Sequence, residues 1–267
     1  MFSSAPSLRS PATGDGPEKK TGKLAFLLGR RAPSAPPGRC LYAIGDVHGR
    51  ADLLDALLNK IAAAARRGEQ ATLIFLGDYV DRGPQSRQVI DRVLRLRDHE
   101  HDVRFLRGNH EAALLDFLIN PEGGRTWMAL GGAETLYSYG VSPPGRGASA
   151  EEMKAASRAF NAALPPSHFE FLQRLETFIR LGDYLFVHAG LRPGRSLDEQ
   201  SEDDMLEIRD TFLKSKARWP YVVVHGHSPV SEAKSAGGRI ALDTGAYATG
   251  KLSAVRLEGE QVSFINT

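Results

Sequence analysis

Cysteine is nearly absent from the 267-residue sequence, which contains only Cys40. A single thiol excludes an internal disulfide framework and a metal cluster built on thiolates. Long apolar runs are also missing, because no stretch approaches the roughly 18 to 20 consecutive apolar residues that span a bilayer. The apolar run LAFLLG near the N-terminus is shorter than the core of a signal peptide. We therefore expect a cytoplasmic protein with no membrane partner.

A strong excess of charge of one sign is missing as well. The formal net charge is +2 and the pI is near 8.7, and no long Lys/Arg run is present, so we expect no nucleic-acid partner. Hydrophobic residues make up 42% of the chain and charged residues 25%, which is ordinary for a globular protein. The length suits one large α/β domain, which we expect to be a monomer.

The composition changes near residue 39. Residues 1–38 are rich in Ser, Pro, Gly and Ala and show no sustained periodicity, so we predict a mostly disordered tail followed by one folded domain over 39–267. The tail contains the short apolar and basic insert KLAFLLGRR. We expect one turn of helix packed on the domain there, with docking on a partner or membrane surface as the alternative.

The first half of the domain alternates between short apolar runs and amphipathic segments. The apolar runs CLYAI, ATLIF and VRFL are separated by segments with helical spacing of leucine, isoleucine and valine. This order predicts a parallel βαβαβ sheet with right-handed crossovers. Open α/β sheets place their ligands past the carboxyl ends of the strands, and charged residues follow each of these three runs.

The second half has a different pattern. The runs TFIRLGDYLFVHAG, YVVVHGHSP, RIALDTGA and LSAVRLEGEQVSFIN are strand-like with short turns, and they predict a mostly antiparallel sheet. Residues 141–177 separate the halves and combine a Pro/Gly loop with a polar helical segment. We predict a lid or specificity insert there.

Five short motifs end five of the predicted strands, and each places glycine beside a residue that can bind metal. Glycine permits the tight turns that direct such side chains toward a ligand. Each motif alone is more often an ordinary polar turn, but their joint occurrence at strand ends favours a metal site. The motifs are GDVHG at 45–49, GDYVDRG at 77–83, GNHE at 108–111, HAG at 188–190 and HGH at 225–227.

The side chains in these motifs suit two cations. Asp46 and His48 project from the same side of extended chain and can reach one cation. Asp78 has two carboxylate oxygens and could bridge that cation to a second one, which Asn109, His188 and His227 would complete. A set of oxygen and nitrogen ligands without thiolate suits Mn²⁺, Fe or Zn²⁺ better than Ca²⁺. We expect two divalent ions. The ligand set alone does not select one of these metals, and Mn²⁺ is our first expectation.

The motifs GDVHG, GDYVDRG and GNHE, in this order, resemble the signatures of the phosphoprotein phosphatase family. These are the serine/threonine phosphatases of the calcineurin-like metallophosphoesterases, and the resemblance is to their small bacterial and phage members over about residues 41 to 250. It implies a metallophosphoesterase fold, in which two packed mixed β-sheets flanked by helices form an αββα sandwich with ligands on the strand-end loops.

The resemblance also implies roles for individual residues. Asp46, His48 and Asp78 would hold one metal. Asp78, Asn109, His188 and His227 would hold the other, with a hydroxide between the two metals attacking phosphorus in line.

The same resemblance implies an acid and a phosphate clamp. His110 would protonate the leaving oxygen, oriented by Asp81. Arg82 would bind phosphate oxygens together with Asn109 and a second arginine, for which Arg209 is the best match. For the second arginine the alternatives are Arg192 and Arg195, and the alternative role for Arg209 is a solvated helix charge.

Several histidines and one aspartate are harder to assign. His225 either supports His227 or is simply packed, and Asp243 either orients a ligand or caps a turn. His99, His101 and His168 lie outside every motif, so we expect them to be solvated.

The function that these expectations favour is a phosphomonoesterase acting on phosphorylated protein, most specifically a protein serine/threonine phosphatase. Symmetrical diadenosine tetraphosphate hydrolases share the metal site but usually carry VARG and GNHD where this chain has VDRG and GNHE, so Asp81 and Glu111 disfavour that alternative. A non-catalytic metal-binding interaction module is a second alternative. We expect such a module to have lost His110 or Arg82, and both are present.

Overall fold

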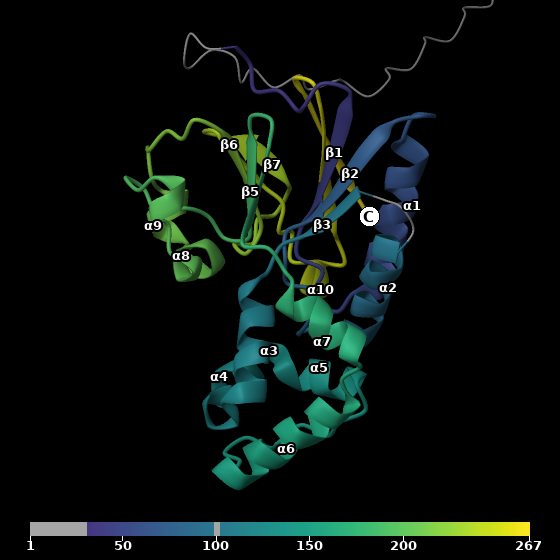
Figure 1. Ribbon diagram of the computed structural model, residues 1–267, viewed down its shortest axis with the longest axis vertical. Helices are drawn as coiled ribbons and strands as arrows, with labels where there is room; N and C mark the ends of the chain where they lie inside the picture. Colours follow the sequence, from purple (N-terminus) through teal and green to yellow (C-terminus); the bar gives the residue numbers. More distant parts are fainter. Residues whose placement is uncertain (1–30, 99–101) are drawn as a thin grey trace, which may run out of the picture.

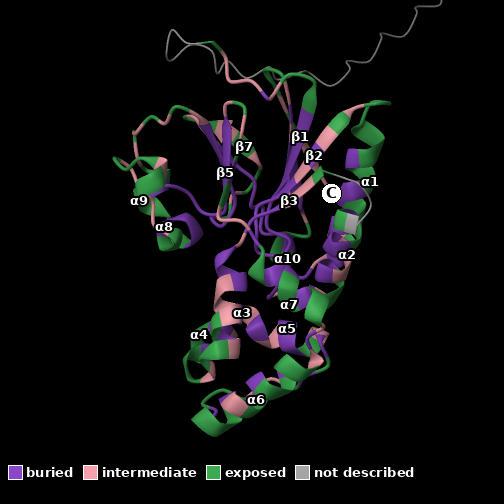
Figure 2. Cartoon of the chain, viewed as in Figure 1, coloured by how far each residue is buried: buried purple, intermediate pink, exposed green. Residues whose placement is uncertain are grey.

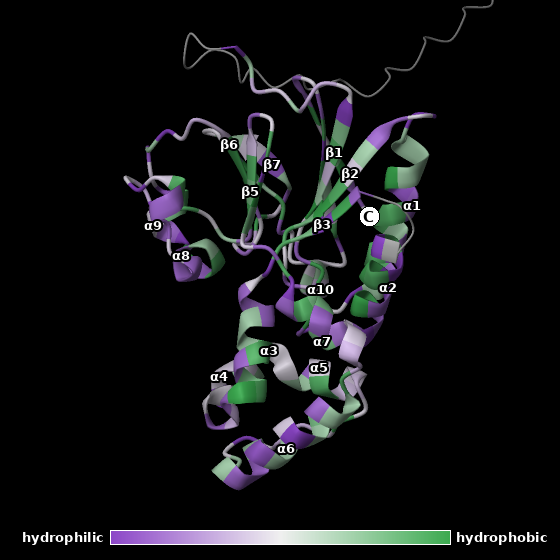
Figure 3. Ribbon diagram, viewed as in Figure 1, coloured by the Kyte–Doolittle hydropathy of each residue, from purple (hydrophilic) through white to green (hydrophobic). Residues whose placement is uncertain are grey.

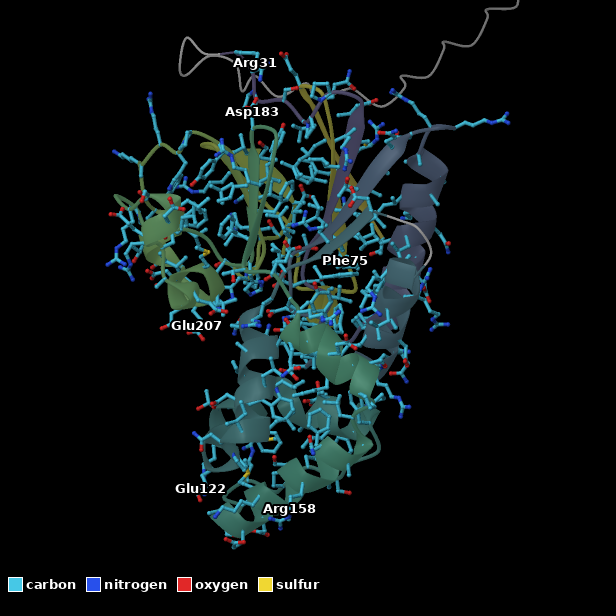
Figure 4. All side chains as sticks on the ribbon, in the orientation of Figure 1. Arg31, Phe75, Glu122, Arg158, Asp183 and Glu207 are labelled. Carbon is cyan, nitrogen blue, oxygen red and sulfur yellow. The ribbon has the colours of Figure 1, made fainter. Side chains whose placement is uncertain are left out.

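The computed structural model describes residues 31–98 and 102–267 (Figure 1). Our expectations for residues 1–30, for the apolar and basic insert and for His99 and His101 fall outside the described residues. The end of the segment that we assigned to the tail, residues 31–38, lies against the domain. Ala35 is buried and its N–H donates to the carbonyl of Gly259 at 2.9 Å. Arg31 pairs with Asp183 at 3.1 Å, at the upper end of the molecule in Figure 4.

The first sheet contains the predicted parallel strands together with the last two strands of the chain. Its order is β10-β9-β1-β2-β3. β1, β2 and β3 are parallel, β9 is antiparallel to β1, and β10 is antiparallel to β9. Helices α1 (Ala51–Ala64) and α2 (Ser86–Asp98) are the two crossovers. The strands are β1 (Arg39–Ile44), β2 (Gln70–Phe75), β3 (Asp102–Phe105), β9 (Ser253–Glu258) and β10 (Gln261–Asn266).

The second sheet is mixed, and our expectation of a mostly antiparallel sheet is wrong. Its order is β4-β5-β6-β8-β7, in which the central strands β5, β6 and β8 are parallel and only the edge strands are antiparallel. The strands are β4 (Phe178–Leu181), β5 (Tyr184–Val187), β6 (Val222–His225), β7 (Lys234–Ala236) and β8 (Arg239–Ala241).

The parallel core has a physical cause in the connections. The chain between β5 and β6 includes η3 (Leu197–Glu199), α8 (Glu202–Glu207) and α9 (Asp210–Leu213). A connection of that length returns the chain to the starting end of the sheet, which a parallel pair requires. The hairpin β9–β10 pairs with β1 and not with its nearer neighbours in the sequence. The sequence pattern did not indicate either pairing.

The two sheets pack face to face between layers of helix, which confirms the αββα sandwich (Figure 1). Successive side chains of β1 point to opposite faces of the first sheet. Leu41 and Ala43 pack with Phe186 and Val224 of the second sheet, whereas Tyr42 lies in the cluster that faces α1 and α2. On the outer face of the second sheet, residues of β5 and β6 contact apolar side chains of α8 and α9. Figures 2 and 3 show the central strands as both buried and hydrophobic.

A group of helices extends beyond one end of the sheets (Figure 1). Residues 141–177, where we predict a lid or specificity insert, contribute α6 and α7 to this group, and Glu122 and Arg158 mark its far end in Figure 4. Among the described residues, no helix is both long and apolar enough to cross a membrane. The helices and turns of the group are α3 (Asn109–Ile119), η1 (Pro121–Gly124), α4 (Arg125–Trp127), η2 (Met128–Gly132), α5 (Ala133–Ser138), α6 (Ala150–Ala163) and α7 (Pro166–Gln173).

Candidate metal centre and acid dyad

The structure brings all six expected metal ligands to one edge of the sandwich. Each follows the carboxyl end of a parallel strand, and the ends of parallel strands meet at one edge of a sheet. The first sheet supplies four of the ligands and the second sheet supplies two. All six are buried, and none is more than 7% exposed. They are Asp46 and His48 after β1, Asp78 after β2, Asn109 after β3, His188 after β5 and His227 after β6.

Four of these side chains point ligand atoms at one small volume. His188 Nε2 lies 3.1 Å from Asn109 Oδ1, 3.2 Å from His227 Nδ1 and 3.5 Å from Asp78 Oδ1. His188 Nδ1 lies 2.8 Å from the carbonyl of Leu76, so the neutral ring donates there and Nε2 keeps a free lone pair. Lone pairs that converge in this way fit a cation.

The other oxygen of Asp78 belongs to a separate group of ligand atoms, which includes His48. His48 Nε2 lies 3.4 Å from Asp78 Oδ2, and His48 Nδ1 lies 2.9 Å from the carbonyl of Val80, which directs the lone pair of Nε2 inward. His110 also belongs to this group, because its ligand atom lies within 4.8 Å of the other two. Asp78 therefore contributes to both candidate metal sites.

Asp46 contributes none of these converging ligand atoms, but one of its carboxylate oxygens has no hydrogen bond. Asp46 Oδ2 accepts from the backbone N–H of His227 at 3.0 Å. Asp46 Oδ1 is buried and has no hydrogen-bond partner among the described residues. A buried carboxylate oxygen without a donor is costly unless a cation compensates it. The residues present thus fit divalent metal at both sites, and their oxygen and nitrogen atoms do not select one metal.

Burial shifts the pKa values of these groups toward their uncharged forms. It raises the pKa of Asp78 to about 6 and holds that of Asp46 well above its usual value. It also holds the pKa values of His48 and His188 well below their usual range and lowers that of His227 to about 3. Near neutral pH the imidazoles are therefore uncharged, which is the form that binds metal.

The backbone of the site is locally strained. Among the described residues, positive φ angles at positions other than glycine occur only in these loops. Such angles are unfavourable for residues with a Cβ atom, and they cluster at functional sites. Glycine is required at two close approaches, because a Cβ on Gly226 would lie 2.0 Å from Asp46 Oδ1 and one on Gly108 would lie 2.1 Å from Asp78 Oδ1. The strained residues are His48, Asp78, Asp81, Arg82 and His227.

His110 and Asp81 form a buried pair beside the candidate metal sites. His110 Nδ1 lies 2.7 Å from Asp81 Oδ2, and His110 Nε2 lies 3.1 Å from Arg82 Nη2. Because a guanidinium only donates, Nε2 accepts from Arg82 and Nδ1 carries the proton shared with Asp81. Burial lowers the pKa of His110, but the negative charges of Asp78 and Asp81 outweigh it and raise this pKa above its usual value.

Arg82 contacts an aromatic ring that our sequence analysis missed. Its guanidinium lies 4.8 Å over the ring of Tyr247, on α10 (Ala246–Thr249), and the same ring packs edge-on against His48 at 5.5 Å. Tyr247 is 40% exposed, so it lies where the site meets solvent. Arg50 Nη1 donates to the carbonyl of Ala246 at 3.1 Å and holds α10 in place.

The structure distinguishes Arg209 from Arg192 as candidates for the second phosphate-binding arginine. Arg209 Nη1 donates to the backbone carbonyl of His227 at 3.3 Å, so its guanidinium lies beside a candidate metal ligand. Arg192 instead makes a two-pronged ion pair with Asp204, at 2.6 and 2.5 Å. Arg209 is thus the one of these two that reaches the site.

Glu111 has a structural role that the sequence motif did not reveal. Its carboxylate is fully buried and accepts from four backbone N–H groups. Oε2 accepts from Asp78 and Gly108, both at 2.9 Å, and Oε1 accepts from Tyr79 at 2.8 Å and Val80 at 3.3 Å. Glu111 therefore fixes the loop that carries Asp78 to the loop that carries Asn109.

The structure assigns roles to His225 and Asp243, which the sequence left open. His225 is buried and packs edge-on against Phe212 at 5.1 Å, so it is a packed residue. Asp243 Oδ1 accepts from the N–H of Gly245 at 2.8 Å and caps that turn. Its charge also raises the pKa of Asp46, after burial.

Our expectation that His168 is solvated is wrong. It is a buried residue of α7, and its ring nitrogens lie 2.9 Å from the hydroxyl of Tyr139 and 3.0 Å from Asp91 Oδ1. The sequence offered no motif for this contact, because it joins residues that are far apart in the chain.

This fold, with candidate metal ligands at the strand ends and the buried His110–Asp81 pair beside them, is typical of a metal-dependent phosphoesterase. Residues 41–256 match the family model described as calcineurin-like phosphoesterase, which covers most of the chain. The chain belongs to this family.

Curated relatives carry names that fit our alternative function better than our main hypothesis. The symmetrical bis(5'-nucleosyl)-tetraphosphatase of Neisseria gonorrhoeae (strain NCCP11945) is 27% identical, over 83% of this chain and 94% of the relative. The asymmetrical bis(5'-nucleosyl)-tetraphosphatase PrpE of Geobacillus thermodenitrificans (strain NG80-2) is 28% identical, over 80% and 88%. A crystal structure of a protein provisionally assigned as a diadenosine tetraphosphatase superposes with a TM-score of 0.60 at 23% identity, over 88% of this chain and 98% of the other, which supports the fold.

Proposed function

We propose that this protein is a divalent-metal-dependent hydrolase of dinucleoside tetraphosphates. One observation carries the proposal: ligand atoms from both sheets converge in two groups that share Asp78, and His110, Asp81 and Arg82 adjoin them. The names of the two curated relatives supply the substrate class. A polyphosphate chain offers both the phosphoryl group that such a centre attacks and the negative charge that nearby arginines bind.

The proposed ligands of the first cation are Asp46, His48 and Asp78, and those of the second are Asp78, Asn109, His188 and His227. We propose Mn²⁺ as the native metal, with Fe or Zn²⁺ as the alternatives. When bound, such ions polarise phosphoryl oxygens, lower the pKa of water and align the phosphorus for in-line displacement.

The side chains beside the ligands have separate tasks in this proposal. Arg82 and Arg209 donate to the non-bridging phosphate oxygens, together with the amide of Asn109. His110 gives a proton to the departing oxygen, and Asp81 holds the ring in the orientation that this transfer needs. Without substrate, Arg82 donates to His110 Nε2. A bound phosphate would draw the guanidinium toward its own oxygens, which leaves Nε2 able to carry the proton.

A second candidate is hydrolysis of phosphate monoesters on protein. The observation that favours it is the buried bond between Asp81 and His110 at 2.7 Å. By the resemblance described above, symmetrical diadenosine tetraphosphate hydrolases usually have alanine at the position of Asp81 and aspartate at that of Glu111. The chain shares these two residues with protein phosphatases.

The test compares three substrates with EDTA-stripped protein, with and without added Mn²⁺. The substrates are diadenosine tetraphosphate, a phosphoserine peptide and a phosphotyrosine peptide. We expect Mn²⁺-dependent turnover of the dinucleotide to exceed that of either peptide. Faster turnover of a peptide would replace the first candidate with the second. If none of the three substrates is hydrolysed although metal is demonstrably bound, both candidate functions are refuted and a non-catalytic module is favoured. Glu151→Gln, at an exposed residue far from the site, is the matched control for active-site variants.

A further inference from the structure

Asp81 is held by a part of the chain that no sequence motif marks. This part, the α4–α5 segment, covers residues 125–138 and contains α4, the π-helical turn η2 and α5. The indole N–H of Trp127 donates to Asp81 Oδ2 at 2.9 Å, and the hydroxyl of Thr135 donates to Asp81 Oδ1 at 2.6 Å. Both partners are buried. Together with His110, these two residues make all the side-chain hydrogen bonds described for the Asp81 carboxylate.

The backbone of Asp81 is held by the same segment. Its N–H donates to Thr135 Oγ1 at 2.9 Å and to Ser86 Oγ at 3.0 Å. Because the Thr135 proton goes to Asp81 Oδ1, the hydroxyl of Ser86 donates to Thr135 at 2.9 Å. Thr135 therefore contacts both the main chain and the side chain of Asp81.

The next residue, Arg82, is held by the π-helical turn. Its N–H donates to the carbonyl of Gly131 at 3.2 Å, and its Nε donates to the carbonyl of Leu130 at 3.5 Å. Gly131 has φ +105°, and a Cβ there would lie 2.8 Å from the nitrogen of Arg82. π-helical turns inside α-helices are frequent at functional sites. Here the turn lets one segment reach two consecutive residues that are both in the left-handed conformation, at φ 71° and 67°.

We propose that Trp127 and Thr135 are positioning residues for His110 as the general acid. The inference rests on the proposed function, because it assigns these two residues to the proton-transfer part of that reaction. Among the described interactions, neither residue contacts a ligand atom of the candidate metal sites. Their effect passes through Asp81, whose two oxygens are fixed by three donors so that one stays directed at His110 Nδ1.

The proposal makes a selective prediction about leaving groups. Loss of a donor to Asp81 loosens the carboxylate and, with it, the orientation of the imidazole. An ester whose leaving group departs without a proton is insensitive to this, whereas one that needs a proton is slowed. A variant that only disturbs the fold would slow both esters alike.

The first experiment compares two aryl phosphates with Mn²⁺-loaded full-length protein. The leaving phenol has a pKa of about 4 in 2,4-dinitrophenyl phosphate and of about 10 in phenyl phosphate, so only the second needs the acid. We expect Trp127→Phe and Thr135→Val to lower kcat for phenyl phosphate by about tenfold or more, and kcat for the dinitrophenyl ester by less than about twofold. Thr135→Ser restores the hydroxyl and is expected to recover the turnover of phenyl phosphate. Trp219→Phe removes an indole N–H elsewhere in the fold and is the control.

Equal losses on the two esters in both variants would overturn the proposal, and so would unchanged kcat for phenyl phosphate. Diadenosine tetraphosphate is assayed in parallel with wild-type protein. If the wild type hydrolyses that dinucleotide and both esters but the variants show no selectivity, the positioning role fails and the proposed function stands. If the wild type hydrolyses none of the three substrates, the proposed function itself fails.

A second measurement does not depend on activity. In ¹⁵N-histidine-labelled protein loaded with diamagnetic Zn²⁺, the proton on Nδ1 of His110 is assigned by its loss in His110→Asn. We expect Trp127→Phe and Thr135→Val to shift this resonance or speed its exchange with water, and Thr135→Ser and Trp219→Phe to leave it unchanged. An unaltered resonance in both of the first two variants would overturn the proposal.

Discussion

Replacing Glu111 with glutamine tests whether one buried carboxylate fixes the loops of the candidate metal centre. The substitution keeps the shape of the side chain but turns one acceptor oxygen into an NH₂ group. Each oxygen of Glu111 accepts from two backbone N–H groups, so either orientation of the amide leaves two of the four donors without an acceptor. At about 1 to 3 kcal/mol for each unsatisfied buried donor, the expected loss is about 2 to 6 kcal/mol of unfolding free energy.

Thermal unfolding measures this loss. For a chain of this size, it corresponds to a fall in Tm of roughly 5 to 20 °C. Burial, followed by the charge of Asp78, raises the pKa of Glu111 to about 8, so the comparison is made at about pH 9, where the wild-type carboxylate is charged. Glu151→Gln changes an exposed carboxylate and is expected to stay within about 0.5 kcal/mol of the wild type. If Glu111→Gln unfolds within about 1 °C of the wild type, the reasoning about the four donors is wrong.

Three further predictions concern the site itself. Asp78→Asn and His110→Asn are each expected to lower turnover at least about a hundredfold, as loss of a shared metal ligand or of an acid should, and wild-type turnover in folded His110→Asn would remove the acid assignment. Arg82→Ala is expected to raise KM and lower kcat together, because it removes a phosphate donor from ground and transition states; an unchanged kcat/KM would exclude this residue from the site. Metal affinity should depend on pH. Burial raises the pKa of Asp78 to about 6, so below that pH a cation must displace a proton. Calorimetric affinity should therefore fall as the pH is lowered through 6, by about tenfold or more per pH unit below it, and a constant affinity between about pH 5 and 7 would contradict the argument.

The ligand loops were predictable because their information is local. Each strand end, with its glycine and its candidate ligand, lies within a few residues of sequence, and the periodicity of the first half places three of those ends along one sheet edge. The two sheets and their helical layers followed from the motif resemblance. Arg209 could be proposed only as the best match, and its contact with the carbonyl of His227 depends on the tertiary structure.

The features that sequence reasoning missed all depend on long-range contacts. The parallel core of the second sheet follows from a connection whose helices, at six and four residues, are too short to show a period. Trp127 and Thr135 contact Asp81 from 46 and 54 residues away. His168 contacts Asp91 from 77 residues away, and a lone histidine outside any motif carries no local sign of burial.

The division of the ligands between the sheets has a consequence for how the protein unfolds. The second candidate cation would join side chains that follow β2 and β3 to side chains that follow β5 and β6, so it would act as a cross-link between two halves of the chain. Separating the sheets would then require release of that ion, and metal concentration would set the frequency of partial opening. Hydrogen exchange at amides of β5 and β6 should slow together with that of β1 and β2 as metal is added, because the sandwich opens as one cooperative unit only while the ion is bound.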